Sequence, residues 1–243
     1  EIRLDSDGVL ELVVSPASPK RVKKVEMYYA LKNPCSFARS WRDTSCVRKG
    51  DKWVGKMPVI NIEDYVFGFA NITYDNTVTL STDFNAAIPS NLGNAKATDK
   101  KSEIIYTGDE GMGAWSNVAE VEGPGGIKGF RSTNNARGSG TEQLSDPKWK
   151  SPSNGQLSFK FYCTQPQTLI FTAADHYEGE IEITASDDWQ EMIIDSNQLL
   201  NRFNKQALKD WSNVGKIQFK PKAGSDITKV IFAEFKWVTS TEK

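Results

Sequence analysis

The chain has 243 residues, of which 38% are hydrophobic, 25% are charged and 11% are aromatic. This composition can bury a core, so it excludes a collagen-like or intrinsically disordered chain. Lys and Arg number 30 against 31 Asp and Glu, and no stretch concentrates positive charge, which argues against nucleic-acid binding. No apolar run approaches the roughly 18 residues that a membrane span needs, so no membrane partner is expected.

Residues 9 to 81 follow the alternation of apolar and polar side chains that is typical of β-strands. Val25, Met27 and Tyr29 share one face of such a segment, which predicts an antiparallel sheet with one face toward solvent. Strands are predicted at residues 10–14, 22–31, 37–42, 52–59, 65–72 and 78–81. Short strands at this spacing predict a small immunoglobulin-like β-sandwich over residues 1–90.

Apolar content falls over residues 91–102, which are predicted to form a linker, and a second domain is predicted over residues 103–243. Residues 108–155 are rich in Gly, Ser and Asn and are expected to be mainly loops, and one or two helical turns are expected near residues 199–208. Strands are predicted at residues 157–163, 168–173, 179–185, 189–194, 216–220 and 229–237. The fold class is therefore all-β, with an Ig-like sandwich followed by a sandwich of the jelly-roll type.

Reactive groups are sparse in this sequence. His176 is the one histidine, so a Ser-His-acid or Cys-His mechanism would have to use it as the base. The G-x-S-x-G elbow and the C-x-x-C and H-E-x-x-H spacings are absent. The carboxylates around Trp189 form no glycosidase signature and are interpreted as solvated groups.

Tryptophans in polar surroundings are the most informative feature. Trp115 and Trp149 each lie among polar residues, where an exposed indole could stack on the C–H face of a sugar or could fold back to close the end of a sandwich. Four other tryptophans occur in strand patterns and are expected in the core: Trp41, Trp53, Trp189 and Trp237.

Two resemblances cover most of the chain. Residues 22–29 (VKKVEMYY), 40–42 (SWR), 50–53 (GDKW) and 69–74 (FANITY) resemble the β-sandwich that follows the catalytic domain in some secreted bacterial α/β-hydrolases. Residues 103–238 resemble galactose-binding-like carbohydrate-binding modules through Trp115, residues 189–194 (WQEMII), residues 210–214 (DWSNV) and residues 231–237 (IFAEFKW).

The second resemblance implies a structural calcium that joins an early loop to the last strand. The matching positions are Asp109, Glu110 and Glu234, and oxygen ligands suit this cation. A surface position for these acids is the alternative. The resemblance also implies a sugar site on the concave sheet or on the loops at one end. The predicted carbohydrate-binding residues are the loop positions Trp115, Arg131, Asn134, Asn135, Arg137, Trp149, His176 and Tyr177.

These observations predict a non-catalytic accessory region of a secreted carbohydrate-active enzyme, which binds polysaccharide or oligosaccharide and is covalently linked to a catalytic domain. The alternatives are a structural module that packs on such a domain, and a carbohydrate esterase or lyase that uses His176. A start at Glu1 without a leader is interpreted as a mature or excised piece, and the expected location is secreted or periplasmic. Cys35 and Cys46 are close enough in sequence for a disulfide, although three reduced cysteines fit equally well.

Overall fold

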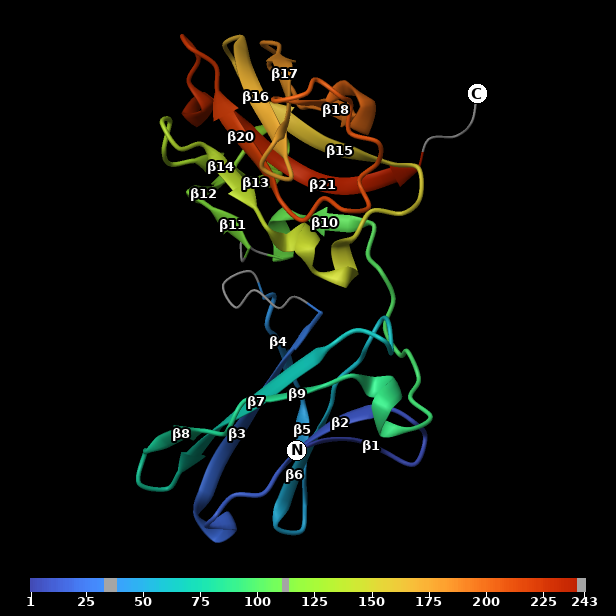
Figure 1. Ribbon diagram of the computed structural model, residues 1–243. Coiled ribbons are helices and arrows are strands. Elements are labelled where there is room, and N and C mark those ends of the chain that lie inside the picture. The colour runs from blue at the N-terminus through green and yellow to red at the C-terminus, as the bar shows by residue number, and fades with distance from the viewer. Residues whose placement is uncertain (33–38, 111–113, 240–243) are drawn as a thin grey trace. The chain divides into compact units, whose positions relative to one another are not determined.

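The computed structural model describes residues 1–32, 39–110 and 114–239, and these residues form an all-β protein (Figure 1). The chain divides into two compact units, Glu1–Lys101 and Ser102–Lys243. The helices of the described residues are 3₁₀ turns of three or four residues, so none of them is long and apolar enough to cross a membrane.

The first unit is a sandwich of two antiparallel sheets. One sheet has the order β1-β2-β6-β5 and consists of β1 (Ile2–Leu4), β2 (Leu10–Val14), β6 (Lys52–Lys56) and β5 (Cys46–Lys49). The other has the order β4-β3-β7-β8, with β9 also paired to β7, and consists of β4 (Arg42–Thr44), β3 (Val22–Leu31), β7 (Val66–Tyr74), β8 (Thr79–Ser81) and β9 (Asn85–Ala87). The predicted strands at 10–14 and 22–31 are confirmed to the residue.

The core of the first unit forms between the inward faces of these sheets. Val25, Met27 and Tyr29 of β3 are buried there, together with Leu12 and Met57 from the other half of the sandwich. After the last strand, the chain bonds back onto the same unit, since the N–H groups of residues 96 and 98 donate to carbonyl oxygens of residues 8 and 59.

Cys46 has a free thiol in this unit, and its Sγ donates to the carbonyl oxygen of Val25 at 3.3 Å. Burial raises the pKa of this thiol above its ordinary value. Cys35, the possible partner for a disulfide, lies outside the described residues.

The second unit also contains two antiparallel sheets. One sheet has the strand order β12-β13-β21-β15-β18, and β10 also pairs with β21. Its strands are β12 (Val118–Glu122), β13 (Lys128–Ser132), β21 (Ile231–Thr239), β15 (Gly155–Tyr162), β18 (Gln190–Ile194) and β10 (Ile104–Tyr106). The other sheet has the strand order β11-β14-β20-β16-β17-β19. Its strands are β11 (Trp115–Ser116), β14 (Ser139–Thr141), β20 (Ile217–Pro221), β16 (Gln167–Ala173), β17 (Tyr177–Ile183) and β19 (Leu200–Asn201).

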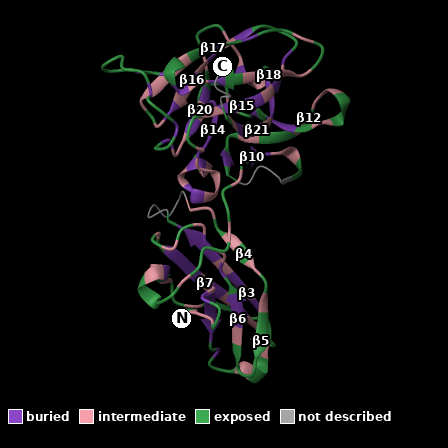
Figure 2. Ribbon diagram, turned by 90° about the vertical axis from the view of Figure 1, so that its right-hand side faces the viewer, coloured by how far each residue is buried: buried purple, intermediate pink, exposed green. Residues whose placement is uncertain are grey.

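Aromatic side chains fill the core of the second unit. Phe159, Phe171, Phe219, Phe232 and Phe235 are all buried with neighbouring ring centroids 4.6 to 6.4 Å apart. Aromatic rings contribute large apolar areas, and their mutual packing adds to the stabilisation that burial provides. Figure 2 shows the buried residues mainly on the strands of each unit and the exposed residues mainly on the connections.

The structure confirms one expectation for the second unit only in part and corrects another. Residues 108–155, expected to be mainly loops, lie mainly outside strands but also contribute the short strands β11 to β14. Residues 199–208, expected to include helical turns, instead contain β19 and the bridge between Leu200 and Ala207. Strand pairing decides both cases, because short segments with weak periodicity take the conformation that a neighbouring strand completes.

Candidate functional site

Most of the predicted carbohydrate-binding residues lie toward two ends of the sheet that contains β14, β20 and β16. Arg131, expected in a loop, instead lies in β13 of the other sheet, where it is paired with Ala119 and Ile231. At the first residue of β14, Ser139 is paired with Phe219 of β20. At its last residue, Thr141 is paired with Ile217 of β20, and Ile217 is also paired with Ala173 at the end of β16. Residues 134–137 precede β14, whereas residues 142–149 follow it and residues 174–177 follow β16. The structure therefore separates Asn134, Asn135 and Arg137 from the group that contains His176 and Tyr177.

Trp115 lies in the core and not in an exposed loop, so the expectation that it stacks on sugar is wrong. Its side chain is 8% exposed, and its ring centroid lies 4.4 Å from that of Phe130 and 4.7 Å from that of Phe235. The physical reason is the pairing of β11 with β14, where Trp115 is opposite Thr141. This pairing places the indole among the buried rings of the second unit.

Trp149 is half-buried in the 3₁₀ turn Pro147–Trp149 and packs against the same core. Its carbonyl oxygen accepts a hydrogen bond of 2.9 Å from the indole N–H of Trp237. The Lys148 ammonium lies 5.6 Å from the centroid of the Trp149 ring. Trp149 therefore helps to close one end of the sandwich, which is the alternative that the sequence left open.

The connection between β13 and β14 uses its asparagines to hold the backbone. Asn135 accepts a hydrogen bond from the N–H of Ile227 at 3.0 Å and donates to the carbonyl oxygen of Ser225 at 3.4 Å. Asn134 accepts from the N–H of Arg137 at 2.9 Å. The Arg131 and Arg137 side chains are exposed. Asn135 is exposed as well, whereas Asn134 is partly buried.

His176 and Tyr177 lie together at the turn that joins β16 to β17. Their ring centroids are 4.9 Å apart, with the planes tilted by 39°. The turn places Ala174 at φ 48° and Asp175 at φ 63°, and the N–H of His176 donates to the carbonyl oxygen of Ala174 at 2.9 Å. Two successive residues with positive φ are typical of the tight turns that match the twist of an antiparallel pair.

A second turn places Arg202 and Phe203 beside His176. Tyr177 is paired with Asn201 of β19, and the N–H of Arg202 donates to the carbonyl oxygen of His176 at 2.9 Å. Phe203 is 77% exposed, and the Arg202 guanidinium lies 5.0 Å from its ring centroid. Sequence reasoning missed Phe203, although its surroundings in NRFNK are as polar as those of Trp115 and Trp149.

Charged groups border the same end of the sheet. The N–H of Ala174 donates to the carbonyl oxygen of Lys216, and the Lys216 ammonium lies 3.0 Å from the Asp175 carboxylate and 3.6 Å from that of Glu142. The hydrogen bond to Asp175 is the main cause that raises the pKa of Lys216. We name this arrangement the His176 cluster, and it consists of Glu142, Asp175, His176, Tyr177, Arg202, Phe203 and Lys216.

The groups of the His176 cluster suit the binding of a polar ligand. His176 contacts the Tyr177 ring, and among the described residues no Ser or Cys side chain is hydrogen-bonded to the imidazole. A nucleophile within hydrogen-bond reach of its base is the usual arrangement for covalent catalysis. The groups that are present, namely partly exposed rings and ionised donors and acceptors, suit the recognition of a polar ligand with an apolar face.

The residues predicted to bind calcium differ in their surroundings. Asp109 lies in the 3₁₀ turn Gly108–Glu110, and the side chain of Glu110 lies outside the described part of the chain. The Glu234 carboxylate lies 2.8 Å from the Lys160 ammonium, which would compete with a cation. No group of three or more His, Cys, Asp or Glu side chains suited to a metal ion is found among the described residues. Calcium at these positions stays a prediction.

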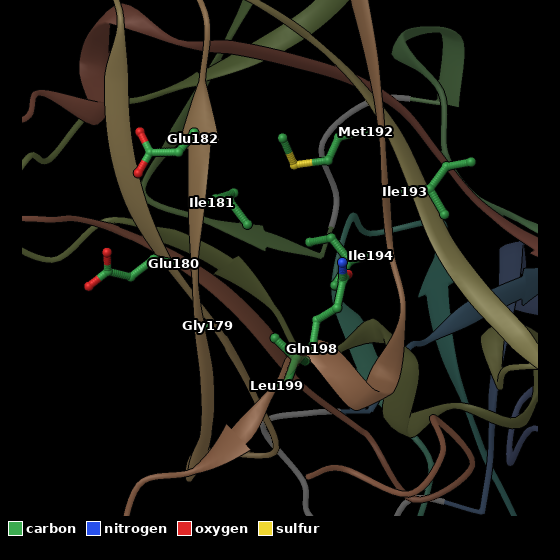
Figure 3. Close-up of a pocket in the computed structure, with 9 residues that line it drawn as sticks. All are labelled: Gly179, Glu180, Ile181, Glu182, Met192, Ile193, Ile194, Gln198 and Leu199. Atoms are coloured by element: carbon green, nitrogen blue, oxygen red, sulfur yellow. The ribbon is translucent and has the colours of Figure 1, made fainter.

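A pocket of about 240 Å³ lies between β17 and β18, away from the predicted residues. Ile181 and Met192 point toward each other across it, whereas the Glu180 and Glu182 side chains point away (Figure 3). Leu199 packs against Gly179 at its base, where a Cβ on the glycine would lie 3.0 Å from Leu199 Cδ2. The pocket is small, and both apolar side chains and the polar residues Glu180, Glu182 and Gln198 line it.

Comparisons with known proteins place the chain in no family. No protein-family model matches it, and no curated protein matches it. Solved structures with some similarity include an exo-β-1,3-galactanase from Phanerochaete chrysosporium with β-1,3-galactotriose. The match has a TM-score of 0.34 at 10% sequence identity and covers 98% of this chain and 55% of that chain. The same enzyme with galactose matches with a TM-score of 0.35 at 11% identity, over 98% of this chain and 56% of that chain. The chain thus spans about half the length of these structures, and such TM-scores assign neither a family nor an activity.

Proposed function

We propose that this chain is a non-catalytic carbohydrate-binding region and that it binds polysaccharide through the His176 cluster. The observation that carries the proposal is Phe203, whose ring is 77% exposed beside the tilted pair of His176 and Tyr177. A ligand that covers this ring removes apolar area from water, and full burial of a ring of this size is worth roughly 1.5–3 kcal/mol.

Saccharides match the two kinds of group that the cluster offers. A pyranose ring has an apolar C–H face, which can lie against Phe203 or Tyr177, and a rim of hydroxyl groups. Arg202 and Lys216 are donors, whereas Asp175 and Glu142 are acceptors, and hydrogen bonds that involve ionised groups are the stronger ones.

The cluster is held in place by its own backbone, which reduces the entropy lost on binding. The turn before β17 is fixed by hydrogen bonds from His176 and Ala174, and the second turn is fixed to it through Arg202. Asn201 also accepts a hydrogen bond from the N–H of Phe203 at 2.9 Å. A ligand that finds its partners already ordered loses less of its binding energy to the ordering of loops.

The wider proposal concerns the role of such binding. In it, the chain is an accessory region of a secreted carbohydrate-active enzyme and keeps a covalently linked catalytic domain close to its polysaccharide substrate. Attachment of this kind acts through effective concentration, so an affinity of about micromolar to millimolar is sufficient. The proposal includes the structural calcium. To bind it, the Glu234 carboxylate would have to give up its ion pair with the Lys160 ammonium and contact the cation instead.

Affinity electrophoresis of the whole chain tests the binding function. The probes are soluble polysaccharides: a neutral β-glucan, a galactan, a xylan and a polyuronate. We expect at least one of them to retard the wild type, and Phe203→Ala to weaken this retardation by about tenfold. The control is Leu92→Ala, which removes exposed apolar area from the first unit. Migration unchanged by every probe, or full retardation of Phe203→Ala, would contradict the proposed site.

A further inference from the structure

The first unit carries a cluster of aromatic side chains on the outward face of one sheet. Along β7, Val66 and Ala70 point into the core, so the alternating residues Phe67 and Phe69 point outward. Tyr28 of β3 is paired with Phe69 and stacks on it, with ring centroids 5.3 Å apart. We name this cluster the aromatic face, and it consists of Tyr28, Trp41, Tyr65, Phe67, Phe69 and Phe84.

The rings of the aromatic face are ordered relative to one another. The Phe67 ring lies within 13° of parallel to Tyr65 and within 19° of parallel to Phe84, with centroids 6.1 and 5.6 Å apart. The plane of the Trp41 indole is nearly perpendicular to two neighbouring rings, at 84° to the Phe69 ring and 78° to the Phe84 ring. The Arg39 guanidinium lies 3.9 Å from the centroid of Phe67. The Phe67 ring is itself only 7% exposed, so Trp41, Tyr65 and Phe84 provide the part of this cluster that faces solvent.

The exposed area of these rings indicates the size of the ligand. Trp41, Tyr65 and Phe84 are 38%, 52% and 51% exposed, so rings of roughly 200 Å² each leave roughly 300 Å² open to solvent. A stable protein complex buries roughly 800 Å² on each partner, which is well above this value. An area of roughly 300 Å² instead matches a short length of a chain molecule with an apolar face.

Polar groups continue the same face along β7. Asn71 and Thr73 follow Phe69 in the outward alternation, and they contact the neighbouring strand β8. Ser81 donates to Asn71 Oδ1 at 2.7 Å, and the hydroxyl groups of Thr73 and Thr79 lie 2.9 Å apart. A ligand that crosses the face would therefore meet rings first, and amide and hydroxyl groups next.

From this arrangement we propose that the aromatic face is a second glycan-binding surface, which takes an extended saccharide with C–H faces on the rings and hydroxyl groups toward the polar part of β7. It extends the proposed function, and it is independent of the His176 cluster because it lies in the other unit and shares no residue with it. With a saccharide site in each unit, we expect the chain to bind polymeric glycans more tightly than short oligosaccharides, because a polymer presents many copies of the recognised segment.

The test is affinity electrophoresis of the whole chain against the same polysaccharides. We expect the double variant Trp41→Ala/Phe84→Ala to weaken the retardation by about tenfold or more. Tyr65→Ala is a milder second variant, expected to weaken it by about threefold, in case the double variant does not fold by circular dichroism. Val47→Ala is the matched control, because Val47 is an exposed apolar residue on β5 of the other sheet.

The outcomes separate this inference from the proposed function. Retardation that is lost in Trp41→Ala/Phe84→Ala but kept in Phe203→Ala would support the aromatic face and refute the His176 cluster. Retardation that is unchanged in the folded aromatic-face variants would overturn this inference and leave the cluster intact. Absence of retardation in the wild type would overturn both. Dimerisation in analytical ultracentrifugation that the double variant abolishes would also overturn this inference, since a second copy would then occupy the face.

Discussion

The Tyr106 hydroxyl is buried in the second unit without a hydrogen-bond partner among the described residues. Its ring packs against Phe130 at 5.2 Å and Trp115 at 6.0 Å between centroids. Burial, and to a lesser extent the negative charge of Glu120, raises the pKa of Tyr106 to about 12. The hydroxyl is thus neutral at ordinary pH and has lost its hydrogen bonds to water.

We therefore expect Tyr106→Phe to increase the free energy of unfolding by about 1 kcal/mol, because it removes a polar group that is desolvated without a compensating hydrogen bond. Urea denaturation measures the change. The control is Thr141→Val, since the Thr141 hydroxyl donates to the carbonyl oxygen of Ala114 at 2.8 Å and accepts from Gln143 N–H at 3.0 Å. Thr141→Val should destabilise by about 1 kcal/mol or more. A loss of stability in Tyr106→Phe would show that its hydroxyl has a partner.

The tryptophans show where the prediction of buried and exposed residues succeeded and where it was wrong. The predicted sugar site includes Trp115 and the predicted core includes Trp41, and the structure reverses both: Trp115 is buried and Trp41 is partly exposed. Trp237, expected in the core, is buried there. Polar neighbours in the sequence do not predict whether a side chain in a short strand is buried, because the direction of the side chain depends on which other strand the short strand pairs with. Phe203 has the same polar neighbours but is exposed, so local sequence does not separate the two cases.

The turn between β16 and β17 keeps a non-glycine residue at positive φ. Ala174, at φ 48°, has a conformational strain that glycine would not have. We expect Ala174→Gly to increase the free energy of unfolding by about 0.5–1 kcal/mol, measured by urea denaturation. The neighbouring Ala173→Gly is the control with the opposite sign, because Ala173 is buried within β16 and its replacement should destabilise by about 1 kcal/mol. Equal effects at both positions would contradict the geometry of this turn.

The sheet of the second unit that contains β15, β21 and β18 has a polar outward face. Ser158 of β15 donates to Glu191 of β18 at 2.6 Å, and the Lys236 ammonium of β21 lies 3.3 Å from the same carboxylate. The Ser158 hydrogen bond is the main cause that lowers the pKa of Glu191 below its ordinary value of 4.5, and Lys236 adds to it. A carboxylate with a lowered pKa stabilises the folded state above its unfolded pKa, and this contribution is lost as the pH falls through the folded pKa.

Glu191→Gln should therefore be less stable than the wild type at about pH 6, and the difference should disappear as the pH falls through the lowered pKa of the Glu191 carboxyl. Thermal unfolding across this range measures the difference in Tm. Ser158→Ala, which removes the donor, should reproduce part of the pattern. A difference in Tm that stays constant on acidification would show that Glu191 contributes through packing rather than through its charge.

Strand prediction succeeded at residues 22–31, because a period of two over many residues specifies both the strand and its buried face. It also succeeded at residues 10–14, a short strand whose five residues are all buried. It failed for β11 to β14, which are two to five residues long and of which all but β12 contain Gly or Ser. Such segments become strands only through long-range pairing, for example of β13 with β21. The site was predicted only in part: His176 and Tyr177 were among the predicted residues, whereas Arg202 and Phe203 join them only through the pairing of β17 with β19.

The whole chain consists of two units, each with a core of its own. The aromatic face belongs to the first unit and the His176 cluster to the second, so the exposed rings of each surface can be changed without entering the other unit's core. Saccharide binding by these exposed rings is the proposal on which the function of both units depends.

The most direct measurement is an NMR titration of the ¹⁵N-labelled chain with oligosaccharides from whichever polysaccharide retards it. We predict saturable amide shifts concentrated at residues 175–177 and 202–204, with a second set at residues 65–73. Shifts that are absent at both places, while binding occurs elsewhere or not at all, would contradict the proposal.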